Sequence, residues 1–235
     1  DMIYQKLEEV LIAKNAVHSV GDEGGFAPNL KTNLDAMELM VEAIRDCQLT
    51  LNQQVFLGLD IAASNLKNGS KYRIKDSPEN LTAEELTDFY VNMKKQYNLF
   101  SIEDPLSEDD WDAWTKLTLE IGSDTMVVGD DLLVTNKTRL EKAIKTKACN
   151  AIIIKPNQVG TITEAVSVVK LAKQNNISVV VSHRSGDTDD IFIADLAVGL
   201  GADYVKFGAP ARGERVAKYN RLSLIELYLR SKALT

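Results

Sequence analysis

The 235-residue chain has only two cysteines, and this scarcity excludes several classes of protein. Cys47 and Cys149 are far apart in the sequence and match no metal-ligand or redox spacing. Two cysteines are also too few for the disulfide framework of a small secreted protein. We therefore expect a protein of a reducing compartment, the cytoplasm.

The chain also lacks long apolar runs and clusters of basic residues. No stretch approaches the roughly 20 apolar residues of a membrane span, and the N-terminus has neither the basic nor the apolar region of a signal peptide. Lysine and arginine number 27 against 34 aspartate and glutamate residues, which gives a net charge of −7. Binding along a nucleic acid needs clustered cations. The sequence thus predicts neither a membrane protein nor a nucleic-acid-binding protein.

Short apolar runs that end in a charged or polar residue recur along the chain. The runs cover residues 56–60, 99–103, 126–130, 151–155, 177–183 and 204–206. Segments with helical spacing alternate with them, and two more such segments, at 4–14 and 33–47, precede them. Capping-box patterns mark several helix starts, at Thr82 with Glu85, Ser107 with Asp110, and Thr161 with Glu164. This alternation predicts parallel strands with right-handed crossovers.

The spacing of the predicted strands indicates an α/β fold of the TIM-type (β/α) barrel class. Six strands do not close an eight-stranded barrel, so we expect an incomplete barrel with two open edges. No linker or low-complexity segment marks a second domain, and we interpret residues 1–235 as one partial domain. Because the chain begins with Asp1 and Met2, we expect that it starts partway through a longer protein or after processing.

Three carboxylates, Asp60, Glu103 and Asp130, stand where three predicted strands end. A single acidic residue there more often solvates a loop or caps a helix. Three at the mouth of one barrel would repel one another unless a cation joined them, and an all-oxygen ligand set suits Mg²⁺ better than zinc. The adjacent Asp104 and Asp131 leave open which member of each pair points inward, because neighbouring strand residues face opposite ways.

Two lysines, Lys155 and Lys206, end two further predicted strands. Most lysines are surface cations, and this is the alternative interpretation. Beside a divalent cation and a second ammonium group, the pKa of such a lysine should fall, which makes it a usable base. The pair suggests proton abstraction combined with stabilisation of negative charge.

Two polar segments are further candidates for a site. Arg184, in the segment 182–186, offers a fork matched to phosphate or carboxylate, but the acidic residues that follow can equally cap a helix. The alternative for His183 is a hydrogen-bonded core histidine. Glu23 lies in a glycine-rich loop at residues 21–25, which suits a general acid or base, or a plain turn between helices.

Together, these segments resemble the enolase family. The matching segments occur in the family's order over nearly the whole chain, at residues 21–29, 58–64, 101–105, 129–136, 155–160, 182–186 and 206–212. The resemblance implies the C-terminal barrel domain of an enolase, truncated so that the N-terminal domain and the first barrel strands are absent. It also implies a hydro-lyase of glycolysis that dehydrates 2-phosphoglycerate to phosphoenolpyruvate with Mg²⁺.

The resemblance also implies a role for each matching residue. The implied metal ligands are Asp60, Glu103 and Asp130. Lys155 is implied as the base that removes the proton next to the carboxylate, Glu23 as the acid that assists departure of the hydroxyl, and Lys206 as a neighbour that stabilises the enolate, in line with the Lys and Mg²⁺ chemistry of enolase-superfamily sites. The implied substrate contacts are Glu103, Asp130, Ser182, His183, Arg184, Ser185 and Lys206, with Arg184 at the phosphate.

Some residues depart from the family pattern. Alternative functions follow from the absence of the N-terminal domain and the first barrel strands. Leu224 stands where the family commonly has an arginine used in dimer contacts. The expected partners remain a small-molecule substrate and, at full length, a second copy of the chain. The alternative function is a catalytically impaired or noncatalytic enolase fragment that acts as a binding or structural protein. A third alternative is another enzyme of the enolase superfamily that acts on a different carboxylate. The loop at Glu23 and the segment at Arg184 disfavour this alternative.

Overall fold

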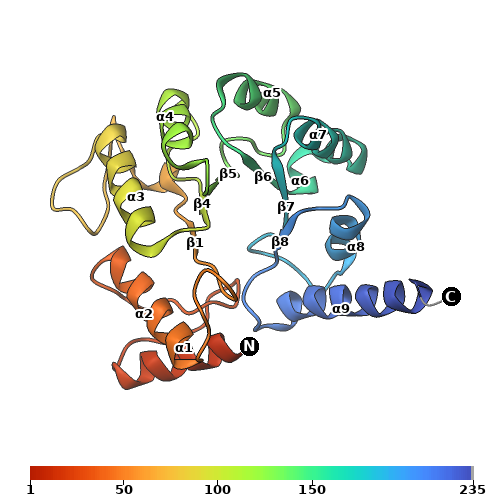
Figure 1. Ribbon diagram of the computed structural model, residues 1–235, viewed down its shortest axis with the longest axis horizontal. Helices are drawn as coiled ribbons and strands as arrows, with labels where there is room; N and C mark the ends of the chain where they lie inside the picture. Colours follow the sequence, from red (N-terminus) through yellow and green to blue (C-terminus); the bar gives the residue numbers. More distant parts are fainter. Residues whose placement is uncertain (234–235) are drawn as a thin grey trace.

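The computed structural model describes residues 1–233 and has the α/β architecture that the alternating pattern predicts. Its main sheet has six parallel strands in the order β1-β4-β5-β6-β7-β8. In Figure 1 the strands gather at the centre and the helices surround them. The sheet is curled but not closed, because β1 and β8 are its two ends. The predicted incomplete TIM-type barrel is confirmed.

The elements follow one another as short strands and longer helices. The strands of the main sheet are β1 (Gly58–Asp60), β4 (Ser101–Glu103), β5 (Met126–Gly129), β6 (Ala151–Ile154), β7 (Ser178–Ser182) and β8 (Tyr204–Lys206). A small hairpin consists of β2 (Lys67–Asn68) and β3 (Lys71–Tyr72). The helices are α1 (Met2–Ala13), α2 (Asn33–Asp46), η1 (Ala63–Leu66), α3 (Ala83–Tyr97), α4 (Trp111–Ile121), α5 (Lys137–Thr146), α6 (Pro156–Val159), α7 (Ile162–Gln174), α8 (Phe192–Gly199) and α9 (Gly213–Ala233). Within residues 1–233, no helix combines the length and the apolar character needed to cross a membrane.

Two apolar layers hold the sheet in place. The main core lies between the strands and the outer helices, and its largest member is Trp114 of α4, whose indole N–H donates to the carbonyl of Ser107 at 3.0 Å. On the other face of the sheet, Val128, Ile153 and Val180 form a smaller cluster. Alternate strand residues face opposite sides. The strands are therefore apolar along most of their length, and their polar residues are confined to the ends.

Side chains, rather than backbone hydrogen bonds, connect the two end strands. Lys206 of β8 donates to Asp60 of β1 at 2.6 Å. The ring of Tyr204 in β8 lies 5.6 Å from the ring of Phe100, the residue before β4. Among residues 1–233 no ladder of backbone hydrogen bonds joins β1 to β8. The two edges that we expected to be open are therefore unpaired along the backbone, but the curl of the sheet lets their polar ends interact.

The predicted helix starts are partly confirmed. Thr82 and Glu85 form a complete capping box at α3, with the threonine hydroxyl accepting from the Glu85 N–H at 3.2 Å and the glutamate accepting from the Thr82 N–H at 2.8 Å. At α7 only half of the box forms. The Thr161 hydroxyl accepts from the Glu164 N–H, but the Glu164 carboxylate bonds to that hydroxyl instead of to the backbone.

The capping box predicted at Ser107 and Asp110 is wrong. Helix α4 begins only at Trp111, and the Asp110 side chain makes no capping hydrogen bond. Its carboxylate instead accepts hydrogen bonds from the Tyr72 hydroxyl and from Lys67 at 2.8 Å. A tertiary contact with the β2–β3 hairpin thus replaces the local cap.

Candidate active site

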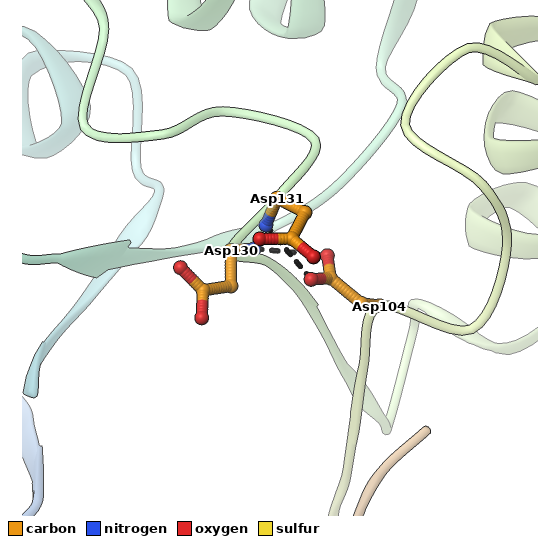
Figure 2. A group of neighbouring side chains, drawn as sticks. All are labelled: Asp104, Asp130 and Asp131. Carbon is orange, nitrogen blue, oxygen red and sulfur yellow. Dashed lines mark hydrogen bonds between the residues drawn. The ribbon is translucent and has the colours of Figure 1, made fainter. Parts of the chain in front are cut away.

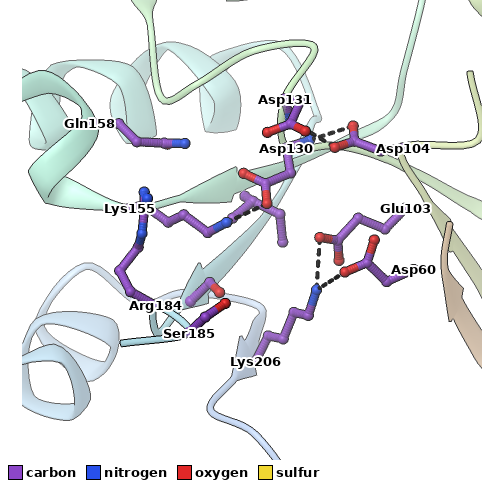
Figure 3. Close-up of polar contacts among 12 residues, drawn as sticks. Asp60, Glu103, Asp104, Asp130, Asp131, Lys155, Gln158, Arg184, Ser185 and Lys206 are labelled. Carbon is purple, nitrogen blue, oxygen red and sulfur yellow. Dashed lines mark hydrogen bonds and ion pairs between the residues drawn. The ribbon is translucent and has the colours of Figure 1, made fainter. Parts of the chain in front are cut away.

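Asp60, Glu103 and Lys206 meet at the carboxyl ends of β1, β4 and β8 (Figure 3). Asp60 and Glu103 are register partners on neighbouring parallel strands, so their side chains emerge at the same height. The Lys206 Nζ donates to Asp60 Oδ2 at 2.6 Å and to Glu103 Oε1 at 2.8 Å. In this structure, one lysine therefore pairs with two of the three predicted metal ligands.

Asp130 and Lys155, which directly follow β5 and β6, form a second ion pair (Figure 3). The Lys155 Nζ donates to Asp130 Oδ2. The other oxygen, Oδ1, is buried and has no hydrogen-bond partner among the described residues. A buried carboxylate oxygen without a donor or cation costs free energy, so each such atom calls for an explanation. Asp130 therefore has one oxygen available for a further positive group.

Burial and these ion pairs set the ionisation of the cluster. Burial raises the pKa of Glu103 to about 7, while Lys206 opposes the shift and Asp60 adds to it. Burial alone would lower the pKa of Lys206, but the charges of Glu103 and Asp60 outweigh burial and raise it well above its ordinary value. The lowered lysine pKa was expected beside a divalent cation and stays a prediction, whereas here the two carboxylates that surround the ammonium group of Lys206 keep it charged. Its positive charge suits the stabilisation of an anion.

Asp104, Asp130 and Asp131 form a further carboxylate cluster (Figure 2). One oxygen of each lies within 4.8 Å of the others, so the cluster could hold a metal ion. However, Asp104 already accepts the backbone N–H of Asp130 at 3.0 Å and that of Asp131 at 2.7 Å. Burial raises the pKa of Asp104 to about 7. Because both of its carboxylate oxygens accept backbone N–H groups, Asp104 orients the turn that carries Asp130. Of the adjacent residues Glu103 and Asp104, it is Glu103 that contacts Lys206.

Glu23, His183 and Ser185 meet where the glycine-rich loop approaches the end of β7. The Ser185 hydroxyl donates to Glu23 Oε1 at 2.8 Å, and His183 Nε2 lies 3.5 Å from Glu23 Oε2. The carbonyl of Glu23 accepts the N–H of Ala209 at 2.9 Å, which ties the loop to the chain after β8. Burial lowers the pKa of His183 to about 4, against the opposing effect of Glu23. His183 is therefore neutral at pH 7, and the turn that carries Glu23 lies against the segment after β7.

Lys155, His183 and Arg184 line one hollow of about 180 Å³ beside the ends of β6 and β7. Arg184 is exposed, whereas Ser182 is buried and its hydroxyl donates to the carbonyl of His183 at 3.0 Å. The predicted base and the predicted anion-binding arginine thus border the same space. Ser182 is engaged with the backbone.

The predicted site residues lie at one end of the sheet, but they form separate groups. Asp60 and Glu103 contact Lys206, whereas Asp130 contacts Lys155. Of the predicted metal ligands, only Asp130 belongs to the compact carboxylate cluster found among residues 1–233. The assignment of Asp60, Glu103 and Asp130 as a joint metal site therefore stays a prediction.

Sequence reasoning missed Arg215, which is fully buried in α9. Its guanidinium group bonds to His183 and to the backbone of both polar segments. A signal was available, because Arg215 and Lys218 share the helical spacing of Tyr219 and Leu222, which pack on the core. Cations on the core-facing stripe of a helix need internal acceptors.

A curled parallel sheet with charged groups at the carboxyl ends of its strands is the arrangement of the α/β barrel class. The family model described as "Enolase, C-terminal TIM barrel domain" matches residues 1–234. A relative named "Enolase" from Natranaerobius thermophilus is 49% identical over 228 residues, which are 96% of this chain and 53% of the relative. The chain belongs to the enolase family, and it spans about half the length of this curated relative.

Proposed function

We propose that this chain carries the active-site residues for the dehydration of 2-phosphoglycerate to phosphoenolpyruvate, a magnesium-dependent hydro-lyase reaction of glycolysis and gluconeogenesis. The observation that carries the proposal is the placement of Lys155 and Glu23 at one end of the sheet, beside carboxylates from neighbouring strands. Loss of a proton and loss of a hydroxyl group from adjacent carbons need a base and an acid at different positions. The family membership of the chain is consistent with this chemistry.

We propose Asp60, Glu103 and Asp130 as the residues that hold Mg²⁺. Carboxylate oxygens are the ligands that Mg²⁺ prefers, and the buried, unpartnered Oδ1 of Asp130 fits a further positive charge. When bound, the ion would supply positive charge beside the carboxylate of the substrate. Because Lys206 pairs with both Asp60 and Glu103 in this structure, its ammonium group would compete with the ion for their oxygens.

In the first half of the proposed reaction, the amine of Lys155 accepts the proton from C2 of the substrate after the proton of its ion pair with Asp130 has passed to solvent. The electron pair of the broken C–H bond then forms an enolate with the adjacent carboxylate. Lys206 keeps a positive charge between Glu103 and Asp60, and this charge stabilises the anion. Arg184 borders the same hollow as Lys155 and is proposed to bind the phosphate.

In the second half, Glu23 gives a proton to the departing hydroxyl group. The C2=C3 double bond forms as the C3–O bond breaks, and the hydroxyl leaves as water. Burial favours the neutral acid, but the bond from Ser185 and the neighbouring His183 and Lys206 lower the pKa of Glu23. The negative charge of a bound substrate raises the pKa of nearby carboxyls. We propose that Glu23 gains its proton in the substrate complex.

We also propose a cytoplasmic protein that forms a homodimer at full length and binds no nucleic acid. The two free cysteines support the location, and the acidic composition supports the expected lack of nucleic-acid binding. The family resemblance implies the dimer, whereas Leu224, 58% exposed on α9, stands where the family commonly has an arginine of the dimer contact and counts against the usual form of that contact.

Formation of phosphoenolpyruvate, followed by its absorbance, tests the proposed function. We compare this chain with a joined protein, in which the chain follows the segment that precedes the matching region in the Natranaerobius relative. We expect little activity from the chain alone. The outer backbone edges of β1 and β8 are unpaired, and the mouth of the incomplete barrel is open to water. The joined protein should be active and dependent on Mg²⁺. A monodisperse, cooperatively melting joined protein without activity would instead favour the noncatalytic binding or structural alternative.

Asp104→Asn in the joined protein should weaken Mg²⁺ binding by about 10–100-fold, because one backbone N–H near Asp130 loses its acceptor and the turn shifts. Titration calorimetry measures the affinity. Asp203→Asn is the matched control, since Asp203 also accepts a backbone N–H, from Val179 at 2.8 Å, at the opposite end of the sheet. Equal affinities in the two variants would show that Asp104 does not position a metal ligand.

A further inference from the structure

Arg215 joins three parts of the site through one guanidinium group. The residue lies in the first turns of α9 and is fully buried. Its Nη2 donates to the carbonyl of Asp22 at 2.9 Å and to that of Ser185 at 2.5 Å. Its Nη1 contacts His183 Nδ1 at 2.7 Å and donates to the carbonyl of Arg184 at 2.7 Å. Helix α9, the glycine-rich loop and the segment after β7 thus share one cation.

The contact with His183 decides which ring nitrogen carries the proton. A guanidinium group can only donate, so His183 Nδ1 must accept. The neutral imidazole therefore carries its proton on Nε2, the atom that lies 3.5 Å from Glu23 Oε2. Arg215 acts on the orientation of the ring and on its tautomer without touching the space where a substrate would bind.

The surroundings leave little freedom for this arrangement. A Cβ added at Gly208 would lie 2.7 Å from the Cδ of Arg215, 2.7 Å from the carbonyl of Glu23 and 3.0 Å from a ring carbon of His183. Lys218, one turn further along α9, is also fully buried and donates to the carbonyl of Thr188 at 2.8 Å. The loop, the ring and the helix are therefore packed together around a fixed cation.

We propose that Arg215 is a positioning residue, which holds His183 as the Nε2–H tautomer and fixes the loop so that Glu23 stays at the mouth of the site. The tautomer of His183 does not depend on the proposed function, but the effect of Arg215 on catalysis rests on the proposed function. Loss of Arg215 should impair the step assigned to Glu23 and spare the proton transfer assigned to Lys155.

Nuclear magnetic resonance of histidine tests the tautomer directly, because the chain has only two histidines, His18 and His183. In this chain labelled with ¹⁵N-histidine, we expect the His183 ring to be protonated on Nε2 at pH 7 and to stay neutral to below pH 5. The groups that act on its charge are Glu23, Arg215, Lys206 and Asp187. A proton on Nδ1, or a doubly protonated ring at pH 7, in the unmodified chain would overturn the proposal without any variant.

Arg215→Lys and Arg215→Met separate charge from geometry. Lysine keeps a positive donor but cannot reach all four acceptors, whereas methionine has no donor for Nδ1, so we expect the Nδ1–H tautomer of His183 to appear in Arg215→Met. Arg221→Lys is the matched control, since Arg221 lies on the same helix but pairs with Asp195 at 2.6 Å. His18, which lies exposed outside the site, should keep its signals. An unchanged His183 tautomer in a folded Arg215→Met variant would contradict the proposal.

Kinetics of the joined protein test the consequence. Arg215→Lys should lower dehydration by about 100-fold, the effect expected of a small displacement of a catalytic group, with exchange of the C2 proton retained. Equal losses of dehydration and exchange would contradict a role through Glu23. If the unmodified joined protein is inactive, the proposed function fails, while the histidine measurement still decides the role of Arg215.

Discussion

Lys155→Met in the joined protein should strongly slow exchange of the C2 proton of 2-phosphoglycerate with solvent, whereas Glu23→Gln should retain it. Lys155 lies at the end of β6 and borders the hollow with Arg184, and no other assigned group takes this proton. A positioned base contributes about 10²–10⁴-fold, so exchange should fall by that factor. Glu23→Gln should lower formation of phosphoenolpyruvate by a similar factor, because the departing hydroxyl loses its acid.

Incubation in deuterated water, with the C2 proton followed by magnetic resonance, measures the exchange. Lys170→Met is the matched control, because Lys170 is exposed on α7 outside the site. Its exchange and dehydration rates should equal those of the unmodified protein. Loss of exchange in Glu23→Gln as well would contradict the separate roles of Lys155 and Glu23.

Asp130→Ala in the joined protein should lower Mg²⁺ affinity by about 100-fold or more, since loss of a direct ligand should exceed the 10–100-fold typical of residues behind the ligands. Asp130 combines burial with an unpartnered oxygen, so its removal takes away the carboxylate best prepared for a cation. Titration calorimetry at constant pH measures the affinity.

Two controls accompany this titration. Asp131→Ala removes the adjacent carboxylate, which is exposed and belongs to the alternative cluster with Asp104. If the ligands are Asp60, Glu103 and Asp130, Asp131→Ala should leave the affinity within about tenfold of the unmodified value. A loss in Asp131→Ala equal to that in Asp130→Ala would assign the metal to the cluster of three aspartates. Unchanged affinity in Asp130→Ala would mean that the proposed ligand set is wrong.

Much of the fold could be predicted because the pattern that defines it is local. Parallel strands that are buried on both faces are apolar throughout. Each strand could therefore be recognised as a short apolar run that ends at a charged or polar residue. Asp60, Glu103 and Lys206 end their strands, and Asp130 and Lys155 follow theirs directly. The capping box predicted for Ser107 and Asp110 does not form, because Tyr72 and Lys67, which are distant in sequence, bind the Asp110 carboxylate.

The sequence by itself determined the residue types of the site, the order of the strands that carry them and the family resemblance. Only the tertiary structure decided which charges pair, because Lys206 reaches Asp60 across the two ends of the curled sheet. It also decided that Glu103 faces this lysine while Asp104 binds the backbone, which depends on side-chain direction at the strand end. Arg215 became visible only in three dimensions, since its four acceptors come from segments 30 or more residues away. Ionisation and positioning depend on such distant neighbours, and these are properties of the folded chain.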